Sequence, residues 1–123
     1  MPDSFFKGRL RSIGTALSGL FKSFRTEPNM QVHLLAALTV TAMGYYFQIS
    51  AIEWGLQCLA IGLVIGLEAI NTAIEELANK VESRKDDQIK LVKDLAAGGV
   101  VFAAFTALLI GGLIYGPRLL SLF

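Results

Sequence analysis

The chain has 123 residues, of which 54% are hydrophobic and only 17% are charged. A water-soluble domain carries about 25% charged residues, so this composition argues against a soluble globular protein and predicts a single domain, residues 1–123, that is dissolved in lipid. The formal net charge of +1 gives no indication of nucleic-acid binding, and we expect no nucleic-acid partner. The single cysteine, Cys58, excludes a disulfide bond within the chain.

The first predicted element, residues 5–27, is an amphipathic helix that lies in the membrane interface. Its apolar residues recur at steps of three and four, which is the spacing of one helix face; they are Phe6, Leu10, Ile13, Leu17, Leu20 and Phe24. Basic residues flank this face, as they do in interfacial helices, although a soluble helix packed on a core has the same pattern. Proline disfavours helical geometry in the residue before it, so Pro28 places Glu27 at a joint between two helices.

Three further helices are predicted to span the membrane: residues 29–48, 52–82 and 88–116. Their apolar parts are residues 32–47, 52–74 and 95–115. A helix needs roughly 20 residues to cross the hydrocarbon layer, and the first of these spans is short. The predicted fold is an all-α membrane protein with one N-terminal amphipathic interfacial helix and three transmembrane helices.

Lysine and arginine residues predict the orientation of these spans. They gather in the N-terminal arm and in the connection between the second and third spans: Lys7, Arg9, Arg11, Lys22, Arg25, Lys80, Arg84, Lys85, Lys90 and Lys93. The turn at 48–53 has none, and the C-terminal tail has only Arg118. Because basic loops stay on the cytoplasmic side, we expect the N-terminus inside and the C-terminus outside.

Polar residues form a stripe on the second span. Glu68, Asn71, Glu75 and Asn79 fall within about 80° of one another on a helix, whereas Glu76 points away and is interpreted as a solvated charge. An ionisable residue that follows a long apolar run is a candidate for function. The alternative is that the stripe only joins helices by hydrogen bonds, but two glutamates and two asparagines in line exceed what that role requires.

The start of the third span carries matching charges. Lys90, Lys93 and Ala97 share a helix face, and Asp94 borders it. Lysine neutralises phosphate charge, and magnesium binds one or two carboxylates together with phosphate oxygens, so the two helices together suit phosphoryl transfer. The chain has no G-x-x-x-x-G-K-[ST] loop and no G-x-G-x-x-G loop. Any nucleotide must therefore be held by helix side chains.

With these motifs the chain resembles the small integral-membrane prokaryotic diacylglycerol kinases and undecaprenol kinases. The matching segments are Glu68-x-x-Asn71-Thr72-Ala73-Ile74-Glu75, Lys93-Asp94-x-Ala-Ala-Gly98 and Arg25-Thr-Glu27-x-Asn29-x-x-x-His33. The resemblance implies a homotrimeric bundle in the bacterial cytoplasmic (inner) membrane, with active sites shared between subunits. It also implies ATP with Mg²⁺ as the phosphoryl donor and a membrane lipid alcohol as the acceptor.

The resemblance also implies roles for individual residues. By position, Glu68 resembles the catalytic base, and Glu27 and Glu75 resemble the metal-binding pair. Positions similar to ATP contacts are Glu27, Asn71, Glu75, Asn79, Lys93 and Asp94. Positions similar to lipid-substrate contacts are Asn29, His33, Glu68 and Ala97.

Two departures from the family pattern affect the nucleotide side of the predicted site. Asn79 stands where the family usually has aspartate, and residues 82–89 lack the usual Tyr-His-containing loop. Diacylglycerol and undecaprenol both remain open as acceptors. A small proton-coupled transporter that uses Glu68 is the main alternative, and a structural membrane adaptor would explain the spans without the acidic stripe.

Overall fold

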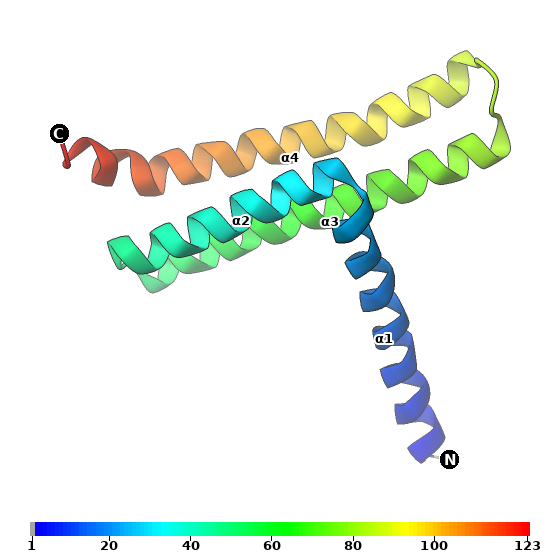
Figure 1. Ribbon diagram of the computed structural model, residues 1–123, viewed down its shortest axis with the longest axis horizontal. Helices are drawn as coiled ribbons and strands as arrows, with labels where there is room; N and C mark the ends of the chain where they lie inside the picture. The colour runs from blue at the N-terminus through cyan, green and yellow to red at the C-terminus, as the bar shows by residue number, and fades with distance from the viewer. Residues whose placement is uncertain (1) are drawn as a thin grey trace.

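The computed structural model describes residues 2–123, with side chains from residue 4 onward, and all regular structure in this part of the chain is α-helical. Its helices are α1 (Pro2–Thr26), α2 (Pro28–Phe47), α3 (Ala51–Val81) and α4 (Asp87–Leu120). Helices α2, α3 and α4 lie side by side, whereas α1 leaves this bundle at a steep angle from the start of α2 (Figure 1). The all-α prediction is confirmed, and α4 continues through Pro117 beyond its predicted end at residue 116.

Local chemistry explains where the helices begin and end. Pro28 is in the first turn of α2, and Glu27 before it is extended, with φ −101° and ψ 116°, as a residue before proline prefers. Helix α2 ends at Gln48, which adopts the left-handed conformation with φ 52°. Helix α3 begins with a capping box, in which the Ser50 hydroxyl accepts from the Glu53 N–H and the Glu53 carboxylate accepts from the Ser50 N–H.

Two of the helices, α3 and α4, are long enough and apolar enough to cross a membrane. With 31 residues, α3 is about 46 Å long, which exceeds the roughly 30 Å of the hydrocarbon layer. Helix α2 does not meet the same criterion, because the polar side chains of Asn29, Gln31 and His33 in its first turns lower its mean hydropathy. The first predicted span, residues 29–48, therefore stays a prediction.

The best-packed apolar cluster lies where α2 ends and α3 begins. Ile49, Ile114 and Tyr115 are buried there against neighbouring side chains of α2, α3 and α4. The C-terminal part of α4 returns to this end of the bundle, while the connection between α3 and α4 lies at the opposite end (Figure 1). Large apolar side chains stay exposed along the helices, among them Leu59 and Phe102, as expected for surfaces that meet lipid or another subunit.

Candidate functional site

The buried carboxylate of Glu68 is at the centre of the candidate site. Glu68 lies in α3 and is only 3% exposed. Its Oε2 atom is 3.5 Å from Nε2 of His33, which α2 presents from the facing side. A buried carboxylate is costly unless it has a partner, so the half-buried imidazole is the group that stabilises it within the chain. The structure thus brings together two residues that the sequence analysis placed at the lipid-binding part of the site.

One turn further along α3, Asn71 and Glu75 form a second polar pair. The Nδ2 atom of Asn71 donates to Oε1 of Glu75 over 3.4 Å, a contact between residues four apart on one helix face. Asn71 is buried, and its Oδ1 atom has no hydrogen-bond partner among the described residues. Buried polar atoms usually have partners, so this oxygen is available to a bound ligand.

An apolar pocket of about 250 Å³ adjoins the Glu68–His33 pair through His33. It lies between α2, α3 and α4, with His33 among its lining residues toward one end and Gln57 and Ile114 toward the other. Between them the pocket wall is formed by small and aliphatic residues: Ala36, Ala37, Val40, Ala60, Ile61, Val64, Ile65, Ala104, Ala107, Leu108, Ile110 and Gly111. Such a lining suits a hydrocarbon chain and gives no hydrogen-bonding partner to a polar ligand.

The two lysines near the start of α4, Lys90 and Lys93, have different partners. The Lys93 ammonium donates to the Asn79 side-chain oxygen across the gap between α4 and α3. Asp94 instead pairs with Lys90 of the same helix over 2.7 Å. Asn79, which stands where the resemblance leads us to expect aspartate, therefore contacts α4 at this end of the bundle.

The remaining predicted residues are more dispersed. Glu27, half-buried at the joint between α1 and α2, lines a hollow together with Glu76 of α3. Its side chain makes no cap hydrogen bond. The residues that the structure describes contain no group of three or more side chains able to hold a metal ion. Asn29 is exposed and Ala97 is half-buried.

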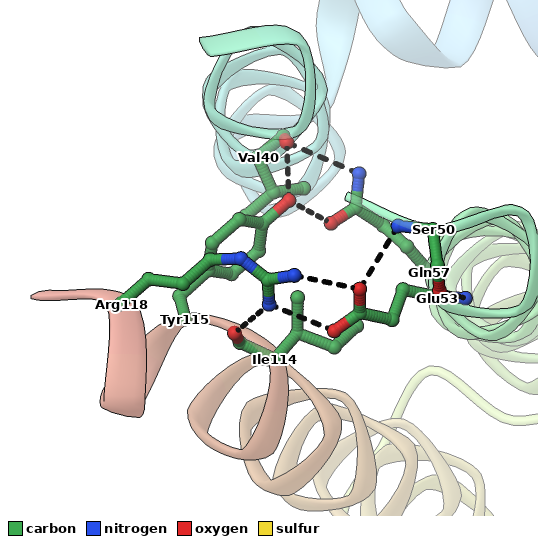
Figure 2. Close-up of polar contacts among 7 residues, drawn as sticks. All are labelled: Val40, Ser50, Glu53, Gln57, Ile114, Tyr115 and Arg118. Atoms are coloured by element: carbon green, nitrogen blue, oxygen red, sulfur yellow. Dashed lines mark hydrogen bonds and ion pairs between the residues drawn. The ribbon is translucent and has the colours of Figure 1, made fainter. Parts of the chain in front are cut away.

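A second buried polar network was not anticipated from the sequence (Figure 2). Gln57 Nε2 donates to the Val40 carbonyl over 3.1 Å, and the Tyr115 hydroxyl lies 2.9 Å from that carbonyl and 2.5 Å from Gln57 Oε1. Arg118 binds both carboxylate oxygens of Glu53 at 2.8 Å. The signal that was available is the single amide of Gln57 within the apolar run of the second span.

Comparisons with known proteins show which family the chain is similar to. A family described as prokaryotic diacylglycerol kinase matches residues 14–115. The chain is 39% identical over 117 residues to an undecaprenol kinase of Bacillus subtilis (strain 168), which covers 95% of this chain and 92% of that protein. It is 32% identical over 114 residues to a diacylglycerol kinase of a Synechocystis species, which covers 92% of this chain and 65% of that protein.

Proposed function

Because this chain belongs to the prokaryotic diacylglycerol kinase family and is a lipid kinase, we propose that it transfers the terminal phosphoryl group of ATP, with Mg²⁺, to the hydroxyl of a membrane lipid alcohol. The acceptor is diacylglycerol, which gives phosphatidic acid, or undecaprenol, which gives undecaprenyl phosphate. Undecaprenol is the first acceptor to test, since the relative with the fuller coverage is an undecaprenol kinase. Kinase chemistry also uses residues that the transporter alternative leaves without a task, such as Lys93.

The observation that carries the proposal is the buried Glu68–His33 pair beside an apolar pocket. A lipid alcohol presents one hydroxyl on a hydrocarbon body, so its chain suits the pocket while its hydroxyl meets the polar pair. We assign the role of general base to Glu68, which accepts the hydroxyl proton as the oxygen attacks phosphorus. His33 faces the same carboxylate and orients it. General base catalysis of this kind typically contributes about 10² to 10⁴ in rate.

The residues present fit a magnesium-bound nucleotide. The unpartnered Asn71 Oδ1 and the carboxylate of Glu75 are hard oxygen ligands on one face of α3, and magnesium takes few protein ligands because phosphate oxygens and water supply the others. When bound, the ion would neutralise charge on the phosphates. We propose that Glu75, with Glu27 as its predicted partner, holds the metal and that Asn71 helps to orient it.

Charges near the end of α3 suit the phosphates and the base of the nucleotide. Lys93 and Asn79 stand together, so a bound phosphate would draw the Lys93 ammonium from an amide oxygen, which is a weaker partner than a carboxylate. We propose that both residues and Asp94 contact ATP. Asn29 and Ala97 are proposed contacts of the lipid headgroup.

The enzyme is proposed to act as a homotrimer in the bacterial inner membrane, with its N-terminus in the cytoplasm. The position of Glu27 supports sites completed by a neighbouring subunit, because Glu27 lines a hollow with Glu76 rather than with Glu75. If the sites are shared, mixing an inactive Glu27→Gln chain with an inactive Glu68→Gln chain restores part of the activity. Mixtures that stay as inactive as either variant would argue for sites contained in one subunit.

The proposal is tested with purified protein in mixed micelles, labelled ATP, magnesium, and either diacylglycerol or undecaprenol. We expect labelled phosphatidic acid or undecaprenyl phosphate, and the acceptor with the higher kcat/KM identifies the substrate. Removal of magnesium with a chelator should stop the reaction and excess magnesium should restore it. Lack of label in both lipids, under conditions in which the protein is folded, would contradict the proposed activity.

A further inference from the structure

One backbone carbonyl group of α2 is in contact with side chains from both other helices of the bundle. The Val40 carbonyl lies within hydrogen-bond distance of Gln57 from α3 and of Tyr115 from α4. Both side chains are 4% exposed. The single hydroxyl proton of Tyr115 lies between two acceptors, since Gln57 Oε1 is 2.5 Å away as well. The three groups therefore form one connected network across α2, α3 and α4 (Figure 2).

The network fixes the position of α2 along its own axis. A buried amide or hydroxyl that loses its partner in an apolar setting is strongly disfavoured. Sliding α2 along its axis without rotating it, or rotating it without sliding it, moves the Val40 carbonyl away from Gln57 and Tyr115 and leaves these buried groups without their acceptor on α2. No other carbonyl of α2 receives a side chain from α3 or α4 among the described residues.

The partner helices are themselves held in register at this end. Arg118 of α4 binds the Glu53 carboxylate of α3 through two parallel hydrogen bonds, an arrangement with defined geometry. Arg118 also donates to the Ile114 carbonyl, and Glu53 accepts from the Ser50 N–H. Tyr115 lies one turn before Arg118, so its position along the axis of α4 is thereby fixed beside Gln57.

The same face of α2 carries the site residue His33. His33 precedes Val40 by seven residues, which is two helical turns, or about 10 Å, and returns to nearly the same direction. Glu68 stands eleven residues after Gln57, again on one side of α3. The contact at Val40 and the contact of His33 with Glu68 therefore join the same faces of α2 and α3.

We propose that Gln57 and Tyr115 are positioning residues for phosphoryl transfer: through the Val40 carbonyl they hold α2 at the register in which His33 faces Glu68. Neither side chain touches the reacting groups, so both act through the helix. The inference rests on the proposed roles of His33 and Glu68. It gives a role in the reaction to residues at the end of the bundle opposite the α3–α4 connection.

The first test removes one oxygen atom. Tyr115→Phe keeps the ring and deletes the hydroxyl, and Tyr46→Phe makes the same change on a ring that is 75% exposed. We expect Tyr115→Phe to lower kcat about three- to tenfold, the factor that corresponds to one net hydrogen bond, with KM for Mg-ATP unchanged. Tyr46→Phe should keep wild-type kinetics. Wild-type kcat per folded molecule in Tyr115→Phe would overturn the proposal.

The second test separates positioning from general loosening of the fold. If Tyr115 acts through His33, the change Tyr115→Phe lowers kcat in the wild-type background but has little further effect in a His33→Ala background, because coupled residues are not additive. If the hydroxyl only stabilises the protein, the fold-losses in kcat of the two single variants multiply in the double variant. Multiplying losses in the double variant would overturn the proposal. Gln57→Met, which keeps the length and removes the amide, should repeat the result of Tyr115→Phe.

A third readout does not depend on kinase activity. Cysteines placed at Ala36 and Val64, which line the same pocket from α2 and α3, form a disulfide at a rate that reports the register of the two helices, in a Cys58→Ser background. Adding Tyr115→Phe should slow this cross-linking several-fold, and an unchanged rate would overturn the proposal. Failure of the proposed function shows separately, as a wild-type protein that phosphorylates neither lipid, while the cross-linking still decides whether Tyr115 sets the register of α2.

Discussion

The most direct prediction concerns the carboxylate of Glu68. Glu68→Gln preserves the shape of the side chain and replaces one carboxylate oxygen with an amide nitrogen, so the base is lost while packing in α3 is kept. The amide remains able to form a hydrogen bond with His33, which lies 3.5 Å away in the wild type. Since the change also removes a charge from a buried position, it should not destabilise the fold.

The expected loss follows from the burial of the site. Glu68 is 3% exposed, so bulk water has little access to replace the missing base. General base catalysis contributes about 10² to 10⁴ in rate, and we expect turnover to fall at least about a hundredfold, or about 2.7 kcal/mol in activation free energy. Binding of Mg-ATP should persist, because it belongs to groups nearer Glu75, roughly 10 Å along α3 by the helical rise.

Turnover and Mg-ATP affinity are measured on the same folded preparation. Glu82→Gln is the matched control, since it makes the same chemical change at the end of α3, where the side chain pairs with Arg84. We expect the control to keep wild-type turnover. Near-normal turnover in Glu68→Gln would refute the assignment of the base, and loss of nucleotide binding with residual chemistry would move Glu68 into the metal site.

Three further predictions address metal, stability and topology. Glu75→Gln should raise the magnesium concentration needed for half-maximal turnover and lower kcat in a folded protein; an unchanged magnesium titration would remove Glu75 from the metal site. Gly44→Ala should lower the free energy of unfolding by about 1–3 kcal/mol, because the added Cβ would lie 2.6 Å from the Trp54 ring; denaturant titration in micelles checks it, and unchanged stability would contradict the packing. A cysteine at Ser121, with Cys58→Ser, should react with an impermeant reagent only from outside the cell, and labelling from the cytoplasm would reverse the predicted orientation.

The sequence by itself determined the helices and the pairs within them. Pro28 predicted the break between α1 and α2, and the apolar runs predicted α3 and α4. It also identified the family, because Glu68, Asn71 and Glu75 stand at fixed intervals on one helix. The contact between Asn71 and Glu75 follows from spacing alone, since residues four apart on a helix are neighbours whatever surrounds them.

Contacts between helices were decided only by the tertiary structure. Lys93 of α4 donates to Asn79 of α3, a contact that the spacing within neither helix indicates. The network of Gln57, in the same way, had no signal beyond one amide in an apolar run. The helical period fixes the direction of each side chain around its own axis. It leaves free the rotation and the shift of one helix against another, and these are set by the packing of all side chains at their shared surface.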